Sequence, residues 1–322
     1  MYRSNKLKTE LSRCKTISIG NLTTGGTGKT PIAIEFARYF TDIDGYNPCI
    51  LSRGYGKKTS NKKTVSVARI ANKLIANSPD ECGDEPFLMA NILDNVTILT
   101  GNNRKELAKL ATDKYACNLL ILDDGFQHLR LERDLNLLLI DRIKLTGNNR
   151  VLPLGPLREP LSEIKRADAI ILVDKNTDCS NIKPLPDEVT NSSIPVFTAS
   201  MVFDGFENIQ TGEKTLSVPF SPVTAFAGIA HPESFFKMVS KHNSHILDTI
   251  AFKDHHNYTK NDILHILNIS NNNESKALIT TQKDAFKIRQ FFSLINLPVY
   301  TLNIKMEINI PEILEKTGFY DK

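Results

Sequence analysis

Short apolar runs alternate with helix-like segments over about the first 200 residues, and this alternation restricts the possible folds more than any other feature. The runs are ISIG (17–20), PCILS (48–52), VTIL (96–99), NLLILDD (118–124), LNLLLID (135–141) and AIILVD (169–174). Helix-like patterns lie between them at 31–40, 85–93 and 105–115. Strands that are apolar at nearly every position and alternate with helices predict a parallel sheet with helices on both faces. Binding loops are then expected at the carboxyl ends of the strands.

A second α/β series follows a polar stretch over 175–195. It begins with VTAFAGIA (223–230) and continues through ILDTIAF (246–252) and KALITT (276–281), with helix-like segments between them. We therefore expect a smaller C-terminal α/β domain. The predicted organisation is a basic N-terminal arm at 1–15, a phosphate-loop core domain at 16–202, a linker or hairpin at 203–222 and the smaller domain at 223–322.

The first apolar run leads into a glycine-rich segment, GNLTTGGTGKTP (20–31). A strict phosphate loop has glycine where this chain has Thr23, but the GGTGKT core is intact. Its glycines allow consecutive amides to point at phosphate oxygens, Lys29 adds a positive charge, and Thr30 offers a hydroxyl to Mg²⁺. The expected nucleotide-binding residues are Thr24, Gly25, Gly26, Thr27, Gly28, Lys29 and Thr30.

An acidic pair ends the fourth run, in LLILDDGFQH (119–128). Adjacent carboxylates repel each other unless a cation lies between them. Asp123 and Asp124 are therefore candidate Mg²⁺ ligands with Thr30, and the alternative is a solvated turn.

Three further polar loops favour a transferase over a switch or a motor. Arg53 in SRGYGKK (52–58) suits a second anion, and Arg158 in GNNRVLPLGPLREP (147–160) offers forked donors to phosphate. Asp84 in GDEP opens a helix, so it is either a partner of the helix dipole or a catalytic base. The NKxD motif of small switch GTPases is not evident at a strand end, and TQKD (281–284) is its nearest imitation.

Composition excludes several other classes. The net charge of +4, from 40 basic and 36 acidic residues, is too small to indicate a nucleic-acid-binding protein. The five cysteines contain no CxxC pair, so we expect reduced thiols rather than a disulfide framework or a metal cluster.

Taken in order, GNLTTGGTGKTP, LSRGYGKK, GDEP, DDGFQH, RDLNLLLID and GNNRVLPLGPLREP closely resemble the tetraacyldisaccharide 4′-kinase family. AFAGIAHPESFF, FKDHHNYT and TTQKDAFK extend the resemblance through the second domain. The resemblance implies a phosphate-loop kinase that uses ATP and Mg²⁺. Its reaction would transfer the γ-phosphate to the 4′-hydroxyl of a lipid A disaccharide 1-phosphate.

The resemblance also implies roles for individual residues. Asp84 matches the proposed base, and His255, rather than His256, matches its partner because it directly follows an aspartate. Lys29 would act in catalysis by neutralising charge on the transferred phosphoryl group. Residues implied to bind substrate are Arg53, Gln127, His128, Arg158 and Glu159.

The start of the chain departs from the family, whose members usually begin with a hydrophobic helix that enters the inner membrane. Residues 1–15 are basic and polar instead, and no apolar run reaches the roughly 18 to 20 residues that span a bilayer. We expect peripheral association with the cytoplasmic side of the bacterial inner membrane and no obligate protein partner. Alternative functions are a soluble phosphate-loop ATPase with an accessory or metallochaperone role, or a membrane-peripheral nucleotide sensor.

Overall fold

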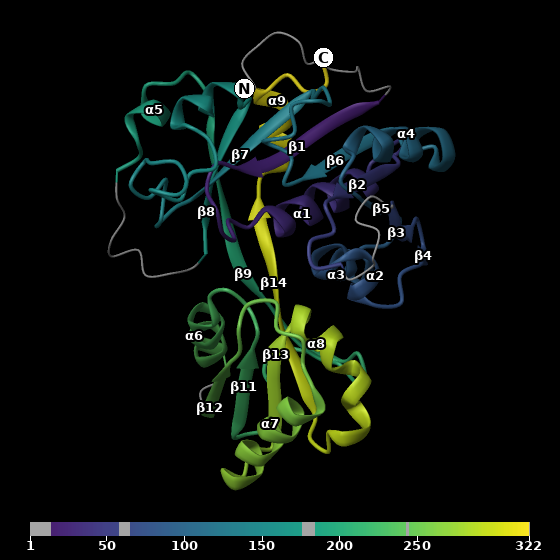
Figure 1. The fold of residues 1–322 in the computed structure, drawn as a ribbon, viewed down its shortest axis with the longest axis vertical. Helices are drawn as coiled ribbons and strands as arrows, with labels where there is room; N and C mark the ends of the chain where they lie inside the picture. Colours follow the sequence, from purple (N-terminus) through teal and green to yellow (C-terminus); the bar gives the residue numbers. More distant parts are fainter. Residues whose placement is uncertain (1–13, 58–64, 176–183, 243–244, 322) are drawn as a thin grey trace. The chain divides into compact units, whose positions relative to one another are not determined.

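The computed structural model of the chain describes residues 14–57, 65–175, 184–242 and 245–321 (Figure 1). Its contacts divide the chain into two compact units. Unit 1 comprises Met1–Met201 and Met306–Lys322, and unit 2 comprises Val202–Lys305. Most of the predicted basic arm, residues 1–13, lies outside the described residues.

Unit 1 contains the predicted parallel sheet, with strand order β9-β8-β7-β1-β6-β2-β5-β3-β4. Its strands are β1 (Lys15–Asn21), β2 (Pro48–Ser52), β3 (Ser66–Ile70), β4 (Lys73–Leu74), β5 (Thr97–Thr100), β6 (Leu119–Asp123), β7 (Leu135–Asp141), β8 (Ala169–Asp174) and β9 (Val196–Asn208). Every run predicted in this domain is a strand. All neighbouring strands from β9 to β5 in this order pair in parallel. Sequence reasoning missed the antiparallel edge formed by β3 and β4.

Helices cover the unit 1 sheet on both faces, as predicted. Leu120 and Leu122 of β6 pack with Leu107 of α4 on one face. Ile121 lies between them in sequence and so points to the other face, where it is equally buried. The helical segments of unit 1 are α1 (Lys29–Thr41), α2 (Pro79–Cys82), α3 (Asp84–Ile92), α4 (Arg104–Tyr115), the 3₁₀ segment η1 (Leu161–Arg166), α5 (Asp187–Thr190) and α9 (Ile310–Lys316).

Unit 2 is a smaller parallel sheet, with strand order β12-β11-β13-β14. Phe226 of β11 packs with Ile266 of α7, whereas the adjacent Ala225 packs with Val239 of α6, so helices lie on both faces here too. A short hairpin of β9 with β10 precedes this sheet, within the segment predicted as a linker or hairpin. The elements are β10 (Lys214–Thr215), β11 (Val223–Ala227), α6 (Pro232–His242), β12 (Ile246–Ala251), α7 (Lys260–Asn272), β13 (Ala277–Thr281), α8 (Gln282–Ile288), the 3₁₀ segment η3 (Arg289–Leu294) and β14 (Val299–Ile308).

The C-terminus corrects the predicted domain organisation, because Met306–Lys322 belongs to unit 1 and not to a domain ending at 322. The Lys15 ammonium donates to the carbonyl oxygen of Phe319 at 2.7 Å. The Phe319 ring is fully buried, with its centroid 5.9 Å from that of Phe40 in α1. A packed aromatic pair and a hydrogen bond from the first residue of β1 therefore attach the last residues to the first unit.

We expect Phe319→Ala to lower the free energy of unfolding of unit 1 by about 3–5 kcal/mol, since it removes a fully buried ring and leaves a cavity. Guanidinium denaturation followed by circular dichroism measures the change. Tyr320→Ala is the control, because that side chain is 49% exposed and should cost less than about 1 kcal/mol. Equal effects of the two substitutions would contradict the docking of the C-terminus through Phe319.

Candidate functional site

The glycine-rich loop between β1 and α1 leaves its backbone accessible to a ligand. Gly25 and Gly28 have φ values of +106° and +88°, a region that residues with a Cβ rarely adopt. A Cβ added at Gly25 or Gly26 would meet no atom within 4 Å. Helix α1 begins at Lys29 with no acidic residue in its first turn. The positive end of the helix and its free amides therefore favour an anion in this loop.

The threonines of the loop differ in their surroundings. The backbone amide of Thr24 donates to the carbonyl of Pro156 at 2.8 Å, so the loop is attached to the segment 147–160. Thr27 is buried, and its hydroxyl has no hydrogen-bond partner within the described part of the chain. Thr30 is buried in the first turn of α1. A bound phosphate or cation would supply the kind of partner that a buried hydroxyl requires.

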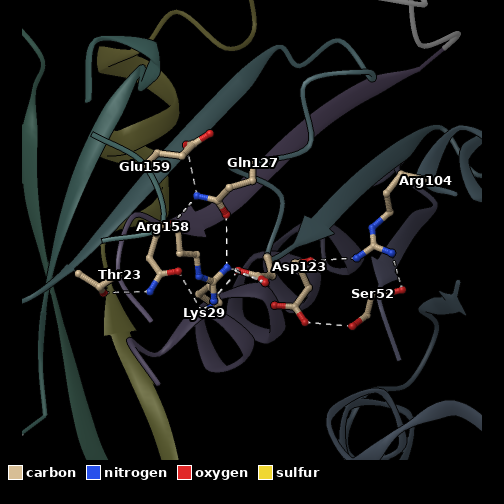
Figure 2. Close-up of polar contacts among 10 residues, drawn as sticks. Thr23, Lys29, Ser52, Arg104, Asp123, Gln127, Arg158 and Glu159 are labelled. Carbon is tan, nitrogen blue, oxygen red and sulfur yellow. Dashed lines mark hydrogen bonds and ion pairs between the residues drawn. The ribbon is translucent and has the colours of Figure 1, made fainter. Parts of the chain in front are cut away.

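Lys29, Asp124 and Arg158 form a charge cluster beside the loop. Lys29 and Arg158 are labelled in Figure 2. The Lys29 ammonium lies 3.5 Å from a carboxylate oxygen of Asp124 and donates to the side-chain oxygen of Asn21 at 3.1 Å. One guanidinium nitrogen of Arg158 donates to both oxygens of Asp124, at 2.9 and 3.0 Å. Burial acts to raise the pKa of Asp124, but Lys29 and Arg158 outweigh it and the pKa is lowered. Asp124 is therefore ionised at neutral pH.

Asp123 has the opposite environment, although it is the adjacent residue. Burial raises its pKa to about 7, and the negative charges of Glu85 and Asp124 act in the same direction. One of its carboxylate oxygens accepts from the Ser52 hydroxyl at 3.2 Å, and the other has no hydrogen-bond partner among the residues described. Asp123 therefore carries a carboxyl group that a nearby cation would keep ionised.

Of the acid pair, Asp123 is the better candidate ligand for a magnesium ion. Within the described ranges, no group of three or more His, Cys, Asp or Glu side chains is arranged to hold a metal. Mg²⁺ commonly takes only one or two protein carboxylates and fills its other positions with water and phosphate oxygens. The unpartnered oxygen of Asp123 suits that role, whereas Asp124 already binds two cationic side chains.

The loops that contain Arg53 and Asp84 meet each other, although 30 residues separate them. A Cβ at Gly54 would lie 2.6 Å from the Cys82 carbonyl oxygen, and one at Gly83 would lie 2.6 Å from the Tyr55 carbonyl oxygen. Only glycine permits this approach of two backbones. Asp84 then begins α3, where the helix dipole stabilises a negative charge. Arg53 is exposed.

The segment 147–160 contributes further residues to the same site. The Arg158 amide donates to the Leu22 carbonyl at 2.6 Å, so this segment is attached to the residue that follows β1. Gln127 donates to the Asn21 carbonyl at 2.9 Å and accepts from Arg158 at 3.3 Å. Glu159 accepts from Gln127 at 3.5 Å, and it also pairs with Arg166. Gln127, Arg158 and Glu159 therefore belong to one network around the phosphate loop (Figure 2).

His128 lies near this network as a neutral side chain. Burial lowers its pKa to about 4, and the surrounding arginines, led by Arg104 and Arg133, act in the same direction. Its Nε2 is buried without a hydrogen-bond partner in the described ranges. A neutral imidazole in this position can donate or accept a hydrogen bond but adds no charge.

In unit 2, the two adjacent histidines have different surroundings. His256 lies 3.2 Å from a carboxylate oxygen of Asp262 and stacks on Phe252 with ring centroids 4.7 Å apart. His255 has a left-handed backbone, with φ of +57°, and a side chain 34% exposed. His256 is thus part of the packing around α7, whereas His255 is more accessible. Asp84 and His255 belong to different units, so their pairing stays a prediction.

Sequence reasoning assigned no role to Arg104, Asp141 or Lys175, which also contact the site. Arg104 is 2% exposed, and it donates to the carbonyl oxygens of Ser52 at 2.8 Å and Asp123 at 3.5 Å. Lys175, just beyond β8, bonds to both the Gly26 carbonyl and the carboxylate of Asp141. Asp141 ends the strand in RDLNLLLID, so its position at a carboxyl strand end was the available signal.

Comparisons with known proteins agree across nearly the whole chain. A family model described as tetraacyldisaccharide-1-P 4′-kinase matches residues 1–317. A protein from Syntrophus aciditrophicus named tetraacyldisaccharide 4′-kinase is 35% identical over 96% of this chain and 83% of its own length. One of the same name from Desulfatibacillum aliphaticivorans is 38% identical over 95% of this chain and 83% of its own length.

A solved structure matches as well. It is the "apo" form of LpxK from Aquifex aeolicus in complex with ATP, and it is 31% identical with a TM-score of 0.75. The match covers 98% of this chain and 90% of that chain.

We expect Asp123→Asn to raise the Tm by about 5 °C at pH 8 in the absence of Mg²⁺. A raised pKa means that the folded state favours the protonated carboxyl. The stabilisation that the protonated Asp123 carboxyl contributes to the folded state is therefore fully present below the ordinary pKa near 4. It is lost as the pH rises through about 7. Differential scanning fluorimetry from pH 4 to pH 8 measures the difference in Tm between variant and wild type, which should shrink toward pH 4.

Asp124→Asn is the matched control for this experiment, because the pKa of Asp124 is lowered rather than raised. Its substitution should lower the Tm at pH 8, where it leaves Lys29 and Arg158 without their shared carboxylate. The same direction of change in both variants at pH 8 would contradict the assigned environments.

Proposed function

Because the chain belongs to the tetraacyldisaccharide-1-P 4′-kinase family, we propose that it transfers the γ-phosphate of ATP to the 4′-hydroxyl of a tetraacyldisaccharide 1-phosphate in lipid A biosynthesis. Family membership confirms the resemblance that the motifs indicated. It favours a kinase over the accessory ATPase considered as an alternative.

The observation that carries this proposal is the open glycine loop with Lys29 at the start of α1 and Asp124 3.5 Å from its ammonium. Such a loop offers amides and one fixed cation to a polyphosphate. The ATP complex of the similar Aquifex aeolicus protein supports ATP as the nucleotide.

In the proposed reaction, the chain contributes mainly positioning and charge. The loop amides bind phosphate oxygens, while Lys29 places positive charge where negative charge builds up on the transferred group. Thr30, Asp123 and Asp124 would hold Mg²⁺, which when bound neutralises charge on the phosphates. Asp123, with one oxygen that has no hydrogen-bond partner among the described residues, is the best placed of these ligands.

Asp84 is the proposed general base, which accepts the proton of the attacking hydroxyl. It lies at the N-terminal end of α3, beside the glycine loop that contains Arg53. His255 is its proposed partner from unit 2. The engagement of His256 with Asp262 and Phe252 supports the choice of His255.

The remaining predicted residues are proposed to bind the sugar phosphate. Arg53 is exposed at the end of β2 and supplies a forked cation. Gln127 and Glu159 would orient Arg158 through the hydrogen bonds that join them. His128, neutral at pH 7, would offer a hydrogen bond to a sugar oxygen.

Membrane location follows from the proposed substrate, which carries four acyl chains. Within the described ranges, no helix is both long enough and apolar enough to cross a bilayer. We therefore propose peripheral association with the cytoplasmic face of the inner membrane.

The function is tested by incubating the protein with γ-labelled ATP, Mg²⁺ and the disaccharide 1-phosphate lipid dispersed in detergent. A kinase labels the lipid, and Lys29→Ala should abolish that label. Release of labelled phosphate at one rate with or without lipid, and no label on the lipid, would establish the ATPase alternative instead.

For the proposed base, we expect Asp84→Asn and His255→Ala each to lower kcat by at least about 100-fold while sparing ATP affinity. The effects on kcat of substituting two residues that act as a pair are strongly non-additive. The double variant should therefore be little slower than the slower single variant. Initial rates with labelled ATP and equilibrium binding of ATP measure the two quantities.

His256→Ala is the matched control for His255→Ala, since it removes the neighbouring imidazole without touching the proposed pair. It should change kcat less than tenfold and act mainly on stability. Multiplicative effects of Asp84→Asn and His255→Ala would show that the two act independently, and lost ATP affinity in Asp84→Asn would move that residue to the nucleotide site.

Lys175 is the proposed positioning residue for the phosphate loop. Carbonyl and amide of a trans peptide point in opposite directions, so the bond from Lys175 to the Gly26 carbonyl also orients the amide of Thr27. We expect Lys175→Met to raise the KM for ATP about tenfold, the value of one charge-assisted hydrogen bond, with a smaller change in kcat. Lys175→Arg should restore part of the affinity.

Lys165→Met is the control for Lys175→Met, because Lys165 is an exposed lysine that lies in η1 and not at the phosphate loop. Steady-state kinetics over a range of ATP concentrations separate KM from kcat. An unchanged KM in Lys175→Met would rule out the positioning role.

A further inference from the structure

The segment between Arg150 and Gly155 exposes a compact group of apolar side chains, which we call the apolar loop tip and define as Val151, Leu152, Pro153 and Leu154. Val151 is 41% exposed, Leu152 is 54% exposed and Leu154 is 70% exposed. Single exposed apolar residues are ordinary, whereas a contiguous group marks a surface that an apolar partner covers.

The backbone of the loop is folded on itself. The Leu152 amide donates to the Leu157 carbonyl at 2.8 Å, and the Leu157 amide donates to the Arg150 carbonyl at 3.1 Å. The amide of Leu154 donates to the Val151 carbonyl at 3.0 Å. The loop therefore satisfies the Leu152 and Leu154 amides internally, while its apolar side chains are exposed.

Close packing at two glycines holds this conformation. A Cβ at Gly155 would lie 2.1 Å from the Asn148 side-chain oxygen and 2.3 Å from the Arg150 carbonyl oxygen. A Cβ at Gly147 would lie 2.5 Å from Pro156. Asn148 also donates to the Leu154 carbonyl at 2.9 Å. The exposure of the tip is thus a property of a defined loop.

These features match the requirements of a lipid surface. Hydrocarbon offers the backbone no hydrogen-bond partner, and two of the three amides of the tip, those of Leu152 and Leu154, donate within the loop. Pro153 has no amide to satisfy. Arg150 precedes the tip directly, and Lys144 lies in the same loop; both are exposed. Cations beside an apolar tip suit anionic head groups above acyl chains.

The loop is continuous with the candidate site. Leu157 is fully buried and forms a bridge with Thr23 next to the phosphate loop. Arg158, the next residue, binds Asp124. Only three residues thus separate Leu154 from Arg158 of the charge cluster.

We propose that the apolar loop tip inserts into the acyl region of an anionic lipid surface while Arg150 and Lys144 contact its head groups. The choice of a lipid as partner rests on the proposed function, whose substrate is itself acylated. Insertion brings Arg158, which follows the tip in the same segment, toward the surface from which that substrate is taken.

The chain contains no tryptophan, so Leu154→Trp gives a single local reporter. We expect its fluorescence to shift to the blue and to be quenched by brominated acyl chains when vesicles of phosphatidylglycerol and phosphatidylethanolamine are added without ATP or disaccharide lipid. Leu216→Trp is the matched control, because Leu216 is 80% exposed in unit 2 and should show neither change.

A second variant measures the contribution of the tip to binding. We expect Leu152→Ser combined with Leu154→Ser to lower vesicle affinity about tenfold in sedimentation, with an unchanged Tm because both side chains are exposed. Transfer to detergent-dispersed substrate should persist in this variant. Loss of vesicle binding with retained transfer thus separates the role of the tip from the proposed function.

Two results would overturn the proposal. Vesicle binding without a blue shift or quenching in Leu154→Trp would show that the tip stays in water. A blue shift that appears without vesicles and grows with protein concentration would show that the tip contacts a second copy of the chain.

Discussion

Two cationic side chains, Lys29 and Arg158, share the carboxylate of Asp124, and the arrangement of the candidate site depends on this charge cluster. The three residues come from the start of α1, the segment 147–160 and the turn after β6. Two cations against one carboxylate leave one positive charge in excess beside an accessible glycine loop. The cluster therefore holds three segments together and still favours a bound anion.

The adjacent aspartates show how position, rather than residue type, divides chemical roles. Asp124 is ionised because two cations contact it, whereas burial and like charges raise the pKa of Asp123 to about 7. One carboxylate thus orders the protein's own cations, and the other keeps an unpartnered oxygen for a ligand. Two identical side chains at one strand end would otherwise repel each other.

The segment 147–160 contributes both to the charge cluster and to an exposed apolar surface. Its C-terminal part pairs with Thr23, just beyond β1, through Leu157 and contributes Arg158 to the charge cluster. Its middle part exposes the apolar loop tip, in which the Leu152 and Leu154 amides donate within the loop. In the proposed kinase, one loop would therefore connect the phosphate-binding site to the lipid surface.

The sequence by itself determined the parallel sheet, the phosphate loop, the acid pair and the family, because hydrophobic periodicity and short motifs encode local backbone structure. It missed β14 and α9, and it assigned the last residues to the wrong unit. Only the tertiary structure decided the bond from Lys175 to Gly26, which spans 149 residues, and the contrast between Asp123 and Asp124. Those properties depend on burial and charge contributed by distant segments, and no local pattern records which segments will meet.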